Sequence, residues 1–322
     1  MMRYAVIGTS GITERFITAA EQTGRYTLAA VCSRSEQRGV AFAEEHGAER
    51  VVTSVEQLAA CDDVEAVYIA SPNALHAAQT EVLLRAGKHV LCEKTATVTA
   101  DEARRLHVLA KEQGLVYREA LMGFYLPERE RILKALPTLG RISYARFEFS
   151  QRSSRYDAYL RGERVNIFDP SLAAGGLMDL GIYCVYPALD LFGMPETIHT
   201  RAVMLKTGVD GSGVSLWEYP DLTVEIVWNK TGQQRSPSTV IGDSGTLTIG
   251  LVSQLSDVRL YRNDGTAEVL SEPRDHTASM TFEAAAFADL VDGGGTDDEA
   301  ATLQIAASEV METMRREIGL KF

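Results

Sequence analysis

A short apolar segment that ends in a glycine-containing turn constrains the fold of this chain more than any other feature. Residues 4–7 have the composition of a buried strand, and Gly8-Thr9-Ser10-Gly11-Ile12 follows them directly. A tight turn from this strand into a helix is predicted, because glycine adopts the dihedral angles that such a turn needs. The free N–H groups at the helix start suit a dinucleotide pyrophosphate. Only two of the three glycines of the G-x-G-x-x-G fingerprint are present, so an ordinary glycine turn stays open as the alternative.

Strand-like and helical segments alternate along the first third of the chain. The predicted strands cover residues 4–7, 27–32, 51–52, 64–70, 89–92 and 115–120, and the predicted helices cover residues 13–23, 37–46, 74–86 and 99–113. This alternation predicts an α/β domain with a doubly wound parallel sheet, a Rossmann domain, at residues 1–122. Ligands of such sheets bind beyond the carboxyl ends of the strands. Several polar residues follow predicted strands and are expected at that edge: Ser33, Ser71, Glu93, Lys94 and Glu119.

The end of the second predicted strand indicates which dinucleotide is bound. An NAD-binding fold often has an acidic residue here to hold the ribose hydroxyls. This chain has Ser33, Arg34 and Ser35 instead, with Arg38 one helical turn later. Guanidinium groups bind phosphate oxygens, which favours NADP and leaves NAD possible. The alternative is a solvated loop in which Ser35 caps the next helix.

Residues 123–322 are predicted to form a second, α+β domain for substrate binding and oligomerisation. Its predicted strands cover residues 142–150, 197–206, 212–219, 222–228, 238–242, 245–249, 258–261 and 267–270, which with their tight turns indicate a large, mostly antiparallel open sheet. Helices are expected at 127–136, from Gly175, at 281–290 and at 299–317. The long polar segment 151–169 offers three substrate contacts, Arg164, Asn166 and Phe168, with a solvated loop as the alternative.

Composition restricts the partners. The net charge is −12 and the pI is near 5.1, which argues against nucleic acid or an anionic membrane as the main partner and favours a small-molecule substrate. The four cysteines, Cys32, Cys61, Cys92 and Cys184, have no metal-like spacing, so we expect free thiols in a reducing cytoplasm and no metal site. No signal peptide and no apolar run of membrane-spanning length are expected.

Three further motifs carry a resemblance to a known family. They are Ser71-Pro72-Asn73-Ala74-Leu75-His76, the segment 86–94 with Ala-Gly-Lys-His-Val and Glu93-Lys94, and the segment 175–183 with Gly-Gly, Asp179, Gly181 and Tyr183. In this order and spacing they resemble the Gfo/Idh/MocA oxidoreductases over the whole chain. The Asp-x-Gly-x-Tyr form most resembles the branch of dimeric dihydrodiol dehydrogenases and sugar dehydrogenases.

The resemblance implies an NAD(P)-dependent oxidoreductase. Such an enzyme transfers hydride between nicotinamide C4 and a hydroxyl or carbonyl group of a sugar, polyol or cyclic diol. Lys94 and Tyr183 are implied as acid–base groups, with Asp179 orienting one of them or the substrate. Asp179 and Tyr183 are four residues apart, which places them on one helix face. Glu93 is implied to contact the nicotinamide ribose, and the cofactor cleft is implied to be lined by Ser71, Pro72, Asn73 and His76. A homodimer or homotetramer through the second sheet is also implied.

Two departures from the family pattern affect the expected site. The family's E-K-P is Glu93-Lys94-Thr95 here, which leaves open whether the Lys94–Thr95 peptide is cis. The family's usual histidine is Tyr183, which retains an ionisable hydroxyl. Two alternatives on the same scaffold stay open: an NAD-dependent glycoside hydrolase and a non-catalytic, cofactor-sensing regulator.

Overall fold

The computed structural model describes residues 1–295 and 298–322, and these divide into two compact units. The first unit consists of Met1–Leu121 and Asp275–Ile305, and the second of Met122–Arg274 and Ala306–Phe322. The sequence prediction assigned everything after residue 122 to the second domain, whereas in the structure Asp275–Ile305 belongs to the first unit.

The packing of helix α9 (His276–Gly293) explains this difference. The helix packs along α1 (Gly11–Thr23). The Tyr26 hydroxyl donates to the Ala284 carbonyl at 2.6 Å, and Arg25 pairs with Asp292 at 2.6 Å. These contacts join segments about 260 positions apart, a separation that local sequence patterns do not reveal.

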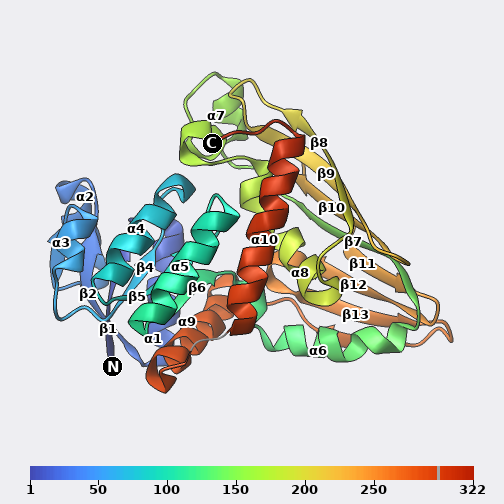
Figure 1. Ribbon diagram of the computed structural model, residues 1–322, viewed down its shortest axis with the longest axis horizontal. Helices are drawn as coiled ribbons and strands as arrows, with labels where there is room; N and C mark the ends of the chain where they lie inside the picture. The colour runs from blue at the N-terminus through green and yellow to red at the C-terminus, as the bar shows by residue number, and fades with distance from the viewer. Residues whose placement is uncertain (296–297) are drawn as a thin grey trace. The chain divides into compact units, whose positions relative to one another are not determined.

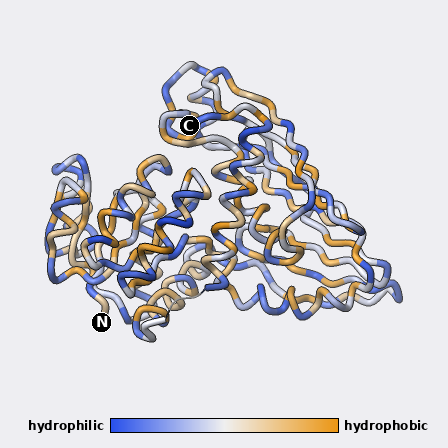
Figure 2. Tube along the Cα trace, in the orientation of Figure 1, coloured by the Kyte–Doolittle hydropathy of each residue, from blue (hydrophilic) through white to orange (hydrophobic). Residues whose placement is uncertain are grey.

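The sheet of the first unit is parallel throughout, with the order β3-β2-β1-β4-β5-β6 (Figure 1). This confirms the Rossmann prediction. The strands are β1 (Met2–Ile7), β2 (Tyr26–Cys32), β3 (Arg50–Val52), β4 (Ala66–Ile69), β5 (His89–Glu93) and β6 (Tyr117–Ala120). The remaining helices are α2 (Glu36–His46), α3 (Val55–Ala59), α4 (Asn73–Arg85) and α5 (Ala100–Gln113), and α10 (Asp298–Glu317) is divided between the units. Along α10 the trace alternates between apolar and polar colours in Figure 2, as expected for an amphipathic helix.

Both faces of this sheet are covered, which is why β4 and most of β1 and β2 are apolar without alternation. On one face Leu58, Leu83 and Leu106 from helices α3, α4 and α5 join a single buried cluster with the strands. On the other face the Phe16 ring of α1 stacks on Tyr68, with ring centroids 3.8 Å apart.

The turn after β1 needs glycine. Gly8 has a φ of +107°, and a Cβ atom there would lie 2.7 Å from the Ala70 carbonyl oxygen. The chain therefore passes from β1 into α1 close against the end of β4. Helix α1 then starts at Gly11, with Ser10 as its N-cap.

The sheet of the second unit has the order β14-β13-β12-β11-β7-β10-β9-β8. Only β7 and β10 pair in parallel, so the predicted, mostly antiparallel sheet is confirmed. The strands are β7 (Ile142–Ser150), β8 (Thr197–Met204), β9 (Asp210–Glu218), β10 (Thr223–Asn229), β11 (Ser238–Gly242), β12 (Gly245–Leu251), β13 (Ser256–Arg262) and β14 (Ala267–Ser271). The helices are α6 (Pro127–Ala135), α7 (Tyr156–Leu160) and α8 (Ile182–Phe192).

The helical segment that carries the second-unit motif packs against β7 and β10. Its first part, Leu177–Gly181, is a π-helical turn that continues into α8. A Cβ atom on Gly176 would lie 2.9 Å from both Trp228 Cδ1 and Asp210 Oδ2. The glycines of the motif therefore allow the helix to approach the sheet closely.

One segment is apolar enough to correct the expectation that no run reaches membrane-spanning length. Pro170–Phe192 meets the criteria of length and composition for a membrane-crossing helix. Because 78% of its most apolar window is buried inside the protein, the segment packs in the core.

Candidate active site

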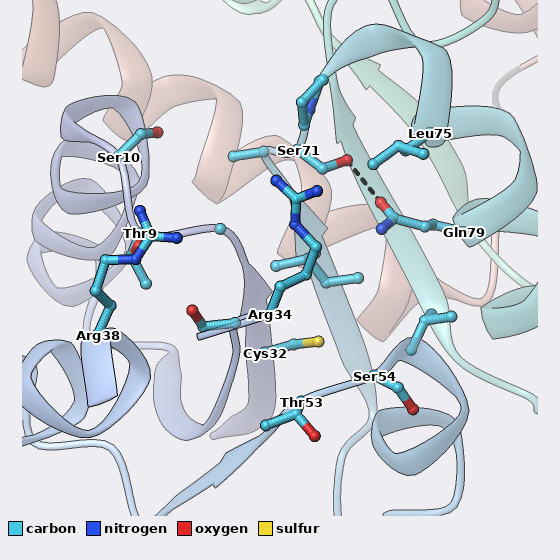
Figure 3. Close-up of a pocket in the computed structure, with 16 residues that line it drawn as sticks. Thr9, Ser10, Cys32, Arg34, Arg38, Thr53, Ser54, Ser71, Leu75 and Gln79 are labelled. Atoms are coloured by element: carbon cyan, nitrogen blue, oxygen red, sulfur yellow. Dashed lines mark hydrogen bonds between the residues drawn. The ribbon is translucent and has the colours of Figure 1, made fainter. Parts of the chain in front are cut away.

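A pocket lies at the carboxyl ends of β1, β2 and β4 in the first unit, with a volume of about 260 Å³ (Figure 3). Eight of the residues predicted to bind the cofactor line it: Gly8, Thr9, Ser10, Ser33, Arg34, Arg38, Ser71 and Pro72. The glycine turn and the segment after β4 thus meet at one site, as the parallel topology requires.

The pocket is basic. Arg34 and Arg38 extend among its lining residues in Figure 3, and no lining residue that the structure describes is acidic. The alternative interpretation of Ser35 is also realised, because its hydroxyl accepts from the Arg38 amide and caps α2. The cap uses the backbone amide of Arg38, so the side chains of Arg34 and Arg38 remain among the residues that line the pocket.

Hydroxyl and amide groups outside the predicted set also line the pocket. Thr53 and Ser54 follow β3, and Gln79 lies on α4, where it accepts a hydrogen bond from Ser71 at 2.6 Å (Figure 3). The short strand β3 gave a weak sequence signal, and no motif includes Gln79. Their position at a strand end was the one signal that could have identified Thr53 and Ser54.

The other predicted cofactor residues lie outside the lining of this pocket: Gly11, Ile12, Asn73, His76, Glu93 and Lys94. Gly11 and Ile12 form the start of α1, where a Cβ atom on Gly11 would meet nothing within 4 Å. Asn73 begins α4. Open space of this kind at the start of a helix suits an anion.

His76 joins two loops of the first unit. Its Nδ1 lies 2.9 Å from the Thr95 carbonyl oxygen, and its Nε2 lies 2.6 Å from the Ser71 carbonyl oxygen. Burial lowers the pKa of His76, while the two carbonyl groups act in the opposite direction. The ring therefore ties the loop after β4 to the segment that carries Lys94.

The segment around Lys94 is held on both sides. The Tyr68 hydroxyl donates to the Glu93 carboxylate, and the Ala96 amide donates to Glu119 Oε1 at 2.7 Å. The Lys94–Thr95 peptide is cis. Lys94 is the one partly exposed residue between Val90 and Thr97, in a segment that is otherwise buried.

In the second unit, burial singles out the two motif residues. From Ala173 to Tyr186 every residue is buried except Asp179 and Tyr183. The Tyr183 ring meets Phe149 edge-on, with centroids 5.4 Å apart. The Asp179 carboxylate forms an ion pair with Lys230, which follows β10. Sequence reasoning missed Lys230, because no local pattern brings the end of β10 to the π-helical turn.

The segment 151–169 is structured rather than an open loop. It contains α7, and Phe168 is buried in an apolar cluster with Val209 and Leu320. This burial argues against direct contact of Phe168 with a substrate. Arg164 pairs with Asp169 at 2.7 Å while its side chain stays exposed, and Asn166 is exposed.

Comparison with known proteins identifies the family. A family model described as an oxidoreductase family with an NAD-binding Rossmann fold matches residues 2–121. A second model, the GFO/IDH/MocA C-terminal domain, matches residues 135–248. The chain belongs to the GFO/IDH/MocA oxidoreductase family. By the description of the first family model, the chain is an oxidoreductase with an NAD-binding Rossmann domain.

Several relatives match this chain over all or nearly all of its length. It is 35% identical over 324 residues to scyllo-inositol 2-dehydrogenase (NADP(+)) IolU of Bacillus subtilis, covering 100% of this chain and 98% of the relative. It is 29% identical to trans-1,2-dihydrobenzene-1,2-diol dehydrogenase of Macaca fascicularis, with the same coverage. The structure of a 3-ketoreductase from Actinomadura kijaniata in complex with NADP and TDP-benzene superposes with a TM-score of 0.84 at 25% identity, over 98% of each chain.

Proposed function

We propose that this protein is an NADP-dependent oxidoreductase that interconverts a ring hydroxyl and the corresponding ketone. The observation that carries the proposal is the pocket at the Gly8 turn, into which Arg34 and Arg38 extend and whose described lining residues include no Asp or Glu. A 2′-phosphate distinguishes NADP from NAD, and guanidinium groups pair with it.

The residues present fit this cofactor. The Gly8 turn and the open start of α1 at Gly11 suit the pyrophosphate, and Arg34 and Arg38 suit the 2′-phosphate. Ser71 and Pro72 would line the adenosine side of the cleft, and Glu93 would bind the nicotinamide ribose. When bound, the nicotinamide supplies or accepts the hydride.

We assign the proton transfer to Lys94 and Tyr183. Oxidation of an alcohol requires a group that removes the hydroxyl proton, and reduction requires a group that returns it. Both side chains are partly exposed within otherwise buried segments, which is the placement such groups need. Asp179 would accept a hydrogen bond from a substrate hydroxyl.

Two relatives support a particular class of substrate. Scyllo-inositol and trans-1,2-dihydrobenzene-1,2-diol are both six-membered carbocycles with adjacent hydroxyl groups. We therefore propose a vicinal diol or polyol on a six-membered ring as the substrate of this chain. Arg164 and Asn166 are candidate contacts for hydroxyl groups further from the reacting carbon.

We propose that the protein acts as a homo-oligomer through the second sheet. The sheet face that does not pack on α8 exposes a set of large apolar side chains: Val203, Val214, Leu216, Ile241, Tyr261 and Val269. Such a patch is typical of an interface.

The four cysteines are free and buried, which supports a reducing, cytoplasmic environment.

Nicotinamide fluorescence on titration with NADPH and with NADH tests the cofactor assignment. We expect NADPH to bind at least about tenfold more tightly, as charge-assisted hydrogen bonds to phosphate predict. Tighter binding of NADH would contradict the role of Arg34 and Arg38.

A panel of inositols, cyclic diols, aldoses and acyclic polyols with NADP then tests the substrate class. Activity confined to acyclic polyols would contradict the proposed six-membered ring substrate.

A further inference from the structure

Lys230 is a buried lysine in the part of the chain that carries the Asp179–Tyr183 motif. Only 4% of the residue is exposed, and its ammonium group pairs with the Asp179 carboxylate. A lysine is rarely buried to this extent without an anionic partner, because desolvation of the charge is costly. Burial of the Lys230 ammonium group therefore favours its ion pair with Asp179.

The backbone at Lys230 is fixed on both sides. The Lys230 amide donates to the Gly211 carbonyl at 2.8 Å, and the Lys230 carbonyl accepts from the Ser153 amide at 2.9 Å. The residue directly follows β10, which is hydrogen-bonded to both β7 and β9. The ammonium group is thus presented from a rigid support rather than from a flexible loop.

The π-helical turn that carries Asp179 is anchored to the same strands at a second point. Asp210 Oδ2 accepts hydrogen bonds from the Leu177 amide at 2.7 Å and from Trp228 Nε1 at 2.6 Å. The turn is therefore held at Leu177 by Asp210 and at Asp179 by Lys230. The side chain of Asp179 nevertheless remains 29% exposed.

We propose that Lys230 is a positioning residue that holds the Asp179 carboxylate ionised and correctly oriented for a substrate hydroxyl beside Tyr183. This inference rests on the proposed function, since it assigns Asp179 to substrate binding. Lys230 acts through Asp179 and is not itself assigned a contact with the reacting atoms.

A double-mutant cycle in kinetics tests the inference with Lys230→Met, Asp179→Asn and the combined variant. We expect each single variant to lose about tenfold or more in kcat/KM, and the combined variant to lose little beyond the more affected single variant. Lys230→Arg keeps the charge and is expected to recover part of the loss. Losses that multiply in the combined variant, or wild-type kinetics in Lys230→Met, would overturn the inference.

Lys88→Met is the matched control. Lys88 is also buried and donates to the Cys61 carbonyl at 2.7 Å, but it precedes β5 rather than following a strand of the second unit. Its replacement removes a buried lysine without touching Asp179. We expect kcat/KM to remain within about twofold of the wild-type value. An equal loss in this control would assign the effect of Lys230→Met to general destabilisation and overturn the inference.

Melting temperatures of the same variants separate this inference from the proposed function. A broken buried pair leaves one uncompensated charge, so each single variant is expected to melt lower than the combined variant. Additive shifts would overturn the coupling of Lys230 with Asp179, whatever the turnover results. A wild-type protein without turnover on the whole substrate panel would contradict the proposed function, and the melting temperatures would still decide the coupling.

Discussion

The two units prepare their chemical groups by different physical means. In the first unit, backbone geometry at the ends of parallel strands forms the pocket, and Gly8 is required by a positive φ and a close approach to Ala70. In the second unit, long-range side-chain contacts from Lys230 and Asp210 hold a π-helical turn. The first kind of site follows from local sequence motifs, whereas the second depends on residues that only the folded sheet brings together.

The largest expected effect concerns Lys94 and Tyr183, the two residues to which we assign the proton transfer. Lys94→Met and Tyr183→Phe should each lower kcat by about 10²- to 10⁴-fold, the range of general acid–base catalysis, with little change in NADPH affinity. Steady-state kinetics and fluorescence titration measure the two quantities. If either variant kept near wild-type turnover, that unit would lose its assigned catalytic role.

Asp210→Ala should damage the second unit alone. It leaves the Leu177 amide and Trp228 Nε1 without their buried acceptor, which we expect to destabilise the protein by about 2–4 kcal/mol. Denaturant unfolding measures this change. Asp221→Ala, which removes an exposed partner of Arg141, is the control and should cost less than about 1 kcal/mol. Weaker NADPH binding by a folded Asp210→Ala protein would show that the two sites are not independent.

Arg34→Ala and Arg38→Ala test the cofactor pocket of the first unit. Each should weaken NADPH binding by about 10- to 100-fold and leave NADH binding nearly unchanged, because only NADPH carries the 2′-phosphate. Fluorescence titration measures both affinities. Arg105→Ala, on the exposed side of α5, should bind both cofactors like the wild type. An equal loss for NADPH and NADH would place the two arginines elsewhere on the cofactor.

The smallest expected effect, taken per pH unit, concerns a buried carboxyl group of the first unit. Burial raises the pKa of Glu283 on α9 well above its ordinary value, and Glu93 and Glu119 add to the shift. The native state therefore keeps a proton that the unfolded state releases, so this contribution to stability is complete below the ordinary carboxyl pKa and declines as the pH rises. Glu283→Gln removes the titration and keeps the shape of the neutral side chain.

We accordingly expect the stability advantage of Glu283→Gln over the wild type to grow as the pH rises, by at most about 1.4 kcal/mol per pH unit. Melting temperatures between pH 5 and pH 9 test this expectation. Glu44→Gln replaces an exposed carboxyl group and serves as the control. A constant difference across the pH range would mean that Glu283 is ionised in the native protein.

Much of the fold followed from the sequence. The predicted strands of both sheets agree with the structure to within a few residues, because each combines an apolar pattern with a clear turn. The segment 151–169 was less predictable, since its helix α7 depends on aromatic packing around Phe168. The return of α9 to the first unit was missed for a similar reason: its contacts with Arg25 and Tyr26 lie about 260 positions away.

The sequence by itself determined the parallel sheet, the glycine turn at its edge, the basic character at Arg34 and Arg38, and the motif residues Lys94, Asp179 and Tyr183. These features depend on local dihedral preferences, strand ends and helical spacing, which are encoded over a few residues. Only the tertiary structure decided that Lys230 faces Asp179. Pairing of β10 with β7 and β9 creates that juxtaposition, and no short-range pattern records the partner of a buried charge.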